Sequence, residues 1–192
     1  MTQDIHNNNK VDNQHNIANV DGNVYFAPKT KLAKMFEKLQ QEVTNNERFE
    51  KIMDALKYYH TKLDGSKDMT AKLQDGGFNN NEITKATRRK EKYAKRLEQN
   101  KFFEYAQKID YHIFGEIIKN FETYVEPLIN SDISKDEIKK AVTEHVINPI
   151  LILINAEGEN DDFLNYNADD IFGMIYYLTG RCHINWKNYD SI

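Results

Sequence analysis

The residues best suited to nucleophilic chemistry are Cys182 and His183, which are neighbours in the sequence. A thiol becomes a good nucleophile when a base or a cation close in space favours the thiolate. Adjacency in sequence does not by itself bring the two side chains together, so an enzyme that uses this pair needs the fold to do so. A small buried cysteine beside a structural histidine is the interpretation we favour. Since the chain has 1 cysteine, it also lacks an internal disulfide and a multi-cysteine zinc site.

Two other histidines have carboxylates nearby in sequence. His112 lies between Asp110 and Glu116, and His145 follows Glu144. Neither forms the HExxH pattern of a zinc protease, and the chain has no P-loop, dinucleotide-binding or nucleophile-elbow glycine motif. We therefore expect no catalytic residues, no metal and no cofactor.

A basic segment is the clearest candidate for binding. Seven basic residues and one acid, Glu91, lie between Lys85 and Arg96. A solvated helix face explains this pattern, but a strip that contacts an acidic partner or phosphates is the alternative. A nucleic-acid-binding regulator would use Arg88, Arg89, Lys92 and Arg96, and its binding would depend on salt.

The overall charge argues against a general attraction to nucleic acid, because the formal net charge is -4 and the pI is about 5.9. An acidic stretch follows later, between Glu157 and Asp170. This stretch could contact the basic segment within one molecule or between molecules.

The elements that would position these residues are predicted to be helices. Apolar residues recur at spacings of three and four, as on one buried helix face, at Phe102, Tyr105, Ala106, Ile109, Ile113, Ile117, Phe121, Tyr124, Val125 and Leu128. Pro127 should stop or kink that helix near its end. A second helix should begin behind a Ser134 cap, with Glu137 completing a capping box, and continue through the apolar run 150–154. Together the two predict a long antiparallel helix hairpin around which the rest is built.

Further helices are predicted on both sides of the hairpin. One should follow Pro28, and another should run from a cap at 45–46 to Leu63. Asn167 should cap a last helix, with Asp169 and Asp170 in its first turn and Gly180 at its C-cap, before a structural tail in which Ile184 and Trp186 pack on the core. The predicted fold is all-α: a helical bundle spanning 28–192 as one domain.

The lead-in at residues 1–27 has a different composition, rich in asparagine. A mobile tail with one small hairpin is the simpler interpretation, because few apolar side chains could offset the entropy of ordering. The alternative is a short extended or β-pairing segment that recruits a partner or a second copy. Its candidate contact residues are Asn16, Ile17, Asn19, Val20, Val24, Tyr25 and Phe26.

Composition favours a soluble protein, with 40% hydrophobic and 29% charged residues. The beginning of the sequence is polar and unlike a signal peptide, and the longest apolar run, 149–156, is shorter than the roughly 20 residues that span a bilayer. We expect a cytoplasmic location.

Several stretches resemble the small helical C-terminal modules of bacterial ABC-three-component conflict systems. They are IANVDGNVYF, KTKLAKMFEKLQQEV, KFFEYAQKIDYHIFGEIIKNFETYVEPLI with VINPILILI, and the closing IFGMIYYLTGRCHINW. The resemblance covers roughly residues 17–187, and its most specific part is 173–186. It implies a non-enzymatic adaptor or oligomerisation component of antiphage defence that works beside an ATPase and a separate effector, or with copies of itself. No catalytic residue is carried over from it.

Overall fold

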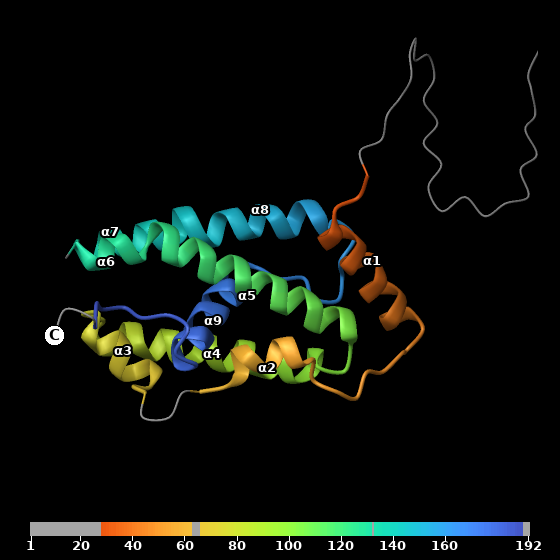
Figure 1. The fold of residues 1–192 in the computed structure, drawn as a ribbon, viewed down its shortest axis with the longest axis horizontal. Coiled ribbons are helices and arrows are strands. Elements are labelled where there is room, and N and C mark those ends of the chain that lie inside the picture. The colour runs from red at the N-terminus through yellow and green to blue at the C-terminus, as the bar shows by residue number, and fades with distance from the viewer. Residues whose placement is uncertain (1–27, 63–65, 132, 190–192) are drawn as a thin grey trace, which may run out of the picture.

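The computed structural model describes residues 28–62, 66–131 and 133–189. Within these ranges every regular element is helical, which confirms the predicted all-α class (Figure 1). The predicted contact segment 16–26 lies outside the described residues. The helices are α1 (Lys31–Thr44), α2 (Asp54–His60), α3 (Met69–Asp75), α4 (Asn80–Asn100), α5 (Glu104–Tyr124), α6 (Glu126–Asn130), α7 (Lys135–Ala141), the π-helical turn η1 (Val142–Ile147), α8 (Asn148–Glu157) and α9 (Ala168–Gly180).

The predicted antiparallel hairpin is present. It pairs α5 with the nearly continuous rod of α7, η1 and α8, and Figure 1 shows the two lying side by side. The Ser134 side chain accepts a hydrogen bond from the amide of Glu137, as predicted, but the Glu137 carboxylate accepts from the Ser134 hydroxyl and not from its amide, so the predicted capping box is only half formed. Pro127 lies in the first turn of α6, where its missing N–H costs nothing. Two residues predicted to be buried on this hairpin are not, since Phe102 is 40% and Tyr124 is 50% exposed.

One turn of the hairpin is wider than an α-helix. The amide of Asn148 donates to the carbonyl of Thr143, five residues earlier, which is the π-helical pattern. Pro149 follows directly and has no N–H, and in a regular α-helix its ring would clash with the carbonyl of His145. The wider turn relieves that clash and rotates α8 relative to α7.

The most buried helix is α9, which lies between the hairpin and the layer formed by α2, α3 and α4 (Figure 1). It packs most extensively against α4. Gly173 allows this close approach, because a Cβ there would lie 2.7 Å from the carbonyl oxygen of Arg89. The fold is therefore organised around α9 as much as around the hairpin that the sequence emphasised.

The predicted helix from 45–46 to Leu63 is wrong over its first half, because α2 begins only at Asp54. Asn46 has a φ of 51°, a left-handed conformation that follows the end of α1 instead of starting a new helix. The segment between is held in an irregular shape by Gln107 of α5, whose side chain accepts a 2.7 Å hydrogen bond from the amide of Met53. A contact this distant in sequence leaves no local signal.

Asn167 caps α9 as predicted, and the cap is reciprocal, which the sequence analysis had not specified. The Asn167 side chain accepts from the amides of Asp169 (2.9 Å) and Asp170 (3.3 Å), and the Asp170 carboxylate accepts from the amide of Asn167 (3.1 Å). The C-terminal prediction was off by a residue or two: Gly180 still belongs to the helix, and Cys182 is the residue with positive φ, 71°.

The substitution Asn167→Ala is expected to lower the free energy of unfolding by about 1 kcal/mol, because two helix amides lose their acceptor. Urea denaturation followed by far-UV circular dichroism measures the change. Asn155→Ala, the same replacement at an exposed position inside α8, should leave stability unchanged or slightly higher. An equal loss in both variants would contradict the capping role.

Candidate functional site

The structure gives Cys182 and His183 different surroundings. The Cys182 thiol lies 2.8 Å from the Ser66 hydroxyl. The His183 ring packs instead against Tyr58 and Tyr59, with centroid distances of 4.8 and 5.3 Å. Burial lowers the pKa of His183, because desolvation disfavours the charged imidazolium. The two sequence neighbours therefore contact different groups.

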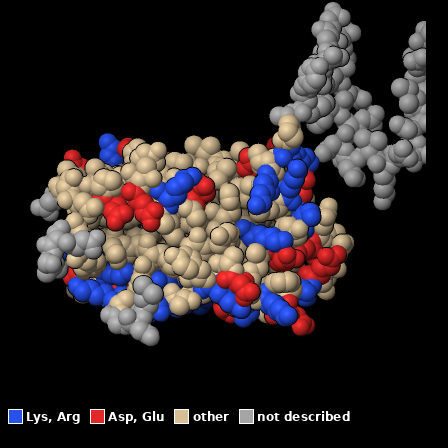
Figure 2. All heavy atoms as spheres, viewed as in Figure 1, with Lys and Arg blue, Asp and Glu red and all other residues tan. Residues whose placement is uncertain are grey.

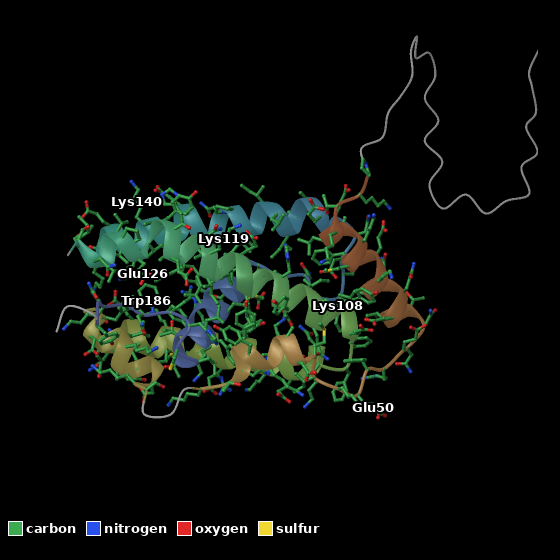
Figure 3. All side chains as sticks on the ribbon, viewed as in Figure 1. Glu50, Lys108, Lys119, Glu126, Lys140 and Trp186 are labelled. Carbon is green, nitrogen blue, oxygen red and sulfur yellow. The ribbon has the colours of Figure 1, made fainter. Side chains whose placement is uncertain are left out.

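The tail beyond this pair folds back onto the core, as predicted. Ile184 and Trp186 are 2% and 5% exposed, and Figure 3 places Trp186 between the hairpin layer and α3–α4. The indole N–H donates to the Thr179 hydroxyl at 3.0 Å. The tail therefore closes one end of the bundle.

Most of the predicted basic face is engaged within the molecule. Arg89 binds Asp169 at 2.7 Å, and Arg96 binds Asp170 at 2.7 Å. Lys92 lies between the two carboxylates, 3.6 Å from Asp169 and 3.4 Å from Asp170. The acidic stretch thus meets the basic helix inside one chain, and it does so through the first turn of α9.

Arg88, the fourth predicted contact residue, is exposed on the outer side of α4 together with Lys85 and Lys95. Lys92 is exposed as well but lies beside Asp169 and Asp170, so Lys85, Arg88 and Lys95 are the exposed cations of this segment that have no carboxylate partner in the described part of the chain. The sequence analysis grouped them with cations that the fold has already paired.

A buried polar centre continues inward from these ion pairs. Asp110 of α5 is fully buried and accepts hydrogen bonds from the hydroxyls of Tyr166 and Tyr93. Burial raises the pKa of Asp110 to about 6, although the Tyr166 and Tyr93 hydrogen bonds oppose the rise. Asn100 donates to the Tyr166 hydroxyl at 2.9 Å, and the Arg96 guanidinium lies over the Tyr166 ring.

The sequence analysis did not single out this centre. A signal was present, because Asp110 lies four residues from both Ala106 and Phe114 and so belongs to the buried stripe of its helix. A carboxyl on such a stripe requires polar partners from other helices. The arrangement serves to tie α4, α5 and α9 together.

Within residues 28–62, 66–131 and 133–189, no group of three metal-ligating side chains lies close enough to hold an ion. None of the helices in these ranges combines the length and the apolar character needed to cross a bilayer.

A match to a protein-family model shows which family the chain belongs to. The sequence model for C-terminal domain 9 (CTD9) of the ABC-three component (ABC-3C) systems matches residues 68–186, which include α3 to α9. The chain belongs to this family. The match confirms the resemblance seen in the sequence and makes the CTD9 chain part of a bacterial defence system with several protein components. No curated protein and no solved structure matches it.

The CTD9 chain also has an apolar surface that the sequence analysis missed. We call it the α8 face: Tyr124, His145, Pro149, Ile152 and Ala156. Ile152 is 69% exposed, and the Tyr124 and His145 rings stack with centroids 5.0 Å apart. No charged residue occurs from His145 to Ala156, and Figure 2 shows mostly uncharged atoms along the edge that α8 forms.

Within the apolar run 150–154, Ile150 and Ile154 are buried while Ile152 faces solvent. Helix geometry could have shown this, because five consecutive residues go more than once around an axis with 3.6 residues per turn. An all-apolar run in a surface helix must therefore present one residue outward.

The described chain begins beside one end of this surface. Thr30, the N-cap of α1, donates a hydrogen bond to the Glu157 carboxylate at the end of α8. Residues upstream of Pro28 therefore connect to the fold near the α8 face.

Proposed function

We propose that this CTD9 chain is a non-catalytic adaptor or oligomerisation component of a bacterial antiphage defence system. It acts through protein–protein contacts made by its helical bundle and by the N-terminal segment Asn16–Phe26. The observation that carries this proposal is the α8 face, an uncharged apolar surface inside the part of the chain that matches the family.

The energetics favour a covered α8 face. Burying an isoleucine side chain contributes roughly 1.5–3 kcal/mol relative to leaving it in water. Ile152 lacks most of that stabilisation in the isolated chain, although Ile150 and Ile154 of the same run are buried. Contiguous apolar surface of this kind is typical of sites where another protein binds.

The alternative, a nucleic-acid-binding regulator that uses the basic helix 85–96, has less support. Phosphate binding needs cations that can exchange their counterions for the backbone of the nucleic acid. Arg89, Lys92 and Arg96 already have carboxylate partners in Asp169 and Asp170. A nucleic acid would have to displace those pairs.

The substitution Ile152→Glu tests the proposal. It should weaken self-association, or co-purification with the ATPase and effector of the same system, at least tenfold, because a carboxylate in an apolar interface loses its hydration. The fold should persist, since the side chain is exposed. Solution mass measurement and co-purification are the readouts, and Gln99→Glu, which adds the same charge on exposed α4, is the control. Unchanged association in Ile152→Glu would remove the observation on which the proposal rests.

The N-terminal segment needs a separate deletion. A chain that lacks residues 1–27 should lose partner capture or form an oligomer with fewer copies of the chain. If partner capture and oligomeric state remain as in the full chain, the segment has no part in recruitment. The role of the α8 face is tested separately by Ile152→Glu.

A further inference from the structure

A cleft of about 260 Å³ opens between α4, the junction of α7 with η1, and α9. Its α4 wall is formed by Glu82, Lys85 and Arg89, which lie on one side of the helix because they are spaced by three and four residues. The opposite wall carries Lys139 and Thr143 at the same spacing. The cleft therefore has cations on two sides.

The floor of the cleft is aromatic. The rings of Phe172 and Tyr176 stack with centroids 6.3 Å apart and an interplanar angle of 17°. Trp186 lies behind Tyr176, and Phe78 meets Trp186 edge to face at 5.0 Å. Because Tyr176, Trp186 and Phe78 belong to the buried core, this floor is rigid and already shaped.

The charge of the cleft is positive. Three cations line it, against one carboxylate, Glu82, but Arg89 is already paired with Asp169 and its guanidinium lies over the Phe172 ring. Glu82 is bound by both Lys135 and Lys139, so its single charge faces two ammonium groups. In the described part of the chain no acidic side chain pairs with Lys85. A positive excess therefore remains at the rim.

The shape and charge together define the occupant. An aromatic floor favours a flat apolar group, and lysines at the rim favour single negative charges beside it. A phosphate dianion fits less well, because Glu82 lies among the cations and only one guanidinium, that of Arg89, is present for forked binding. An aromatic side chain flanked by carboxylates satisfies both parts of the cleft.

We propose that this cleft binds an acidic segment of a partner protein, whose aromatic side chain rests on Phe172 and Tyr176 while its flanking carboxylates meet Lys85 and Lys139. This proposal rests on the proposed function, since it gives the chemistry of one partner that an adaptor would take. The site is separate from the α8 face, so the two can be tested independently.

The probe is a short fluorescent peptide with a central phenylalanine flanked on both sides by glutamates, titrated with the full chain at low salt and followed by anisotropy. The peptide should bind, and its affinity should fall as salt rises. Replacing its glutamates by glutamines, or its phenylalanine by alanine, should weaken binding at least tenfold. Equal affinity for all three peptides would overturn the proposal.

Variants of the chain locate the site. Lys85→Glu reverses a rim charge, and Thr143→Tyr fills the cleft without changing its charge; each should weaken peptide binding at least tenfold. Lys95→Glu makes the same charge change on an exposed part of α4 outside the cleft and should leave binding unchanged. If Lys95→Glu weakens binding as much as Lys85→Glu, the attraction is diffuse and the cleft is not the site.

Two further outcomes separate this proposal from its alternatives. A single-stranded oligonucleotide or inorganic phosphate that displaces the peptide more effectively than unlabelled peptide would identify a phosphate site and overturn it. Ile152→Glu should bind the peptide as the unmodified chain does. If the peptide fails to bind while Ile152→Glu still loses its partner, the cleft proposal fails and the proposed function stands.

Discussion

Replacing Trp186 by alanine is expected to lower the free energy of unfolding by about 3–5 kcal/mol. The indole is 5% exposed and contacts rings from three separate parts of the fold, Phe78, Phe121 and Tyr176. The alanine variant loses the transfer free energy of a large side chain and leaves a cavity that the surrounding helices cannot easily close. Such a loss is a large fraction of the total stability of a domain of this size.

Urea denaturation followed by far-UV circular dichroism measures this loss, because the variant lacks the tryptophan that fluorescence would use. Trp186→Phe is the matched control: it keeps an aromatic ring but gives up the 3.0 Å hydrogen bond to Thr179, so a smaller loss is expected. In the unmodified chain the single tryptophan should emit at the short wavelengths of a buried indole. Emission typical of an indole in water would contradict the packing of the tail.

The parts of the fold that the sequence predicted correctly depend on local chemistry. The caps at Ser134 and Asn167 were identified because a cap and its partner lie within three residues of each other. The stripe of α5 was recognisable because its periodicity repeats over several turns. The packing of Ile184 and Trp186 followed from the cost of leaving large apolar groups in water.

The parts that were missed depend on contacts between distant residues. Gln107 holds the segment before α2 out of the helix predicted there. The turn at η1 responds to Pro149, and its wider geometry is not encoded in a simple repeat. Helix geometry requires one residue of the run 150–154 to face outward, but that this residue is Ile152 depends on the rod lying at the edge of the bundle.

The candidate site was predicted only in part. The basic helix and the acidic stretch were both identified, and contact between them was one of the stated possibilities. Which cations would be paired depends on the position of Asp169 and Asp170 at the start of α9, packed against α4. The aromatic floor of the cleft likewise combines Phe78, Phe172 and Trp186, which lie far apart in the sequence.

The buried carboxyl of Asp110 leads to the second large effect. Between pH 4 and pH 7, stability relative to an Asp110→Asn variant is expected to fall by about 3 kcal/mol. The pKa of Asp110 is about 6 in the folded chain, against 3.8 for an ordinary aspartate. In this window the folded state holds one proton more than the unfolded state, so stability decreases as pH rises, by about 1.4 kcal/mol per pH unit between the two pKa values.

Two histidines titrate in the same pH range, and their effect on the pH dependence of stability has the opposite sign. Burial lowers the pKa of His60 and of His183, so their contributions to stability are lost as pH falls below the ordinary histidine value. Both histidine contributions cancel in the difference in unfolding free energy between the unmodified chain and Asp110→Asn, because both proteins contain these histidines. Urea denaturation at several pH values gives that difference directly.

The pH dependence of this stability difference also measures how well the polar centre stabilises the charged Asp110 carboxylate. Tyr166 and Tyr93 donate to the same oxygen of Asp110, and its other oxygen has no hydrogen-bond partner within the described residues. Tyr166, Tyr93, Asn100 and the charge of Arg96 together stabilise the carboxylate less than burial destabilises it, so the pKa of Asp110 lies above its usual range. Removing one donor by Tyr93→Phe should raise it further and extend the pH dependence upward. A stability difference that stays constant from pH 4 to pH 7 would show that the hydroxyls and Arg96 fully compensate for burial.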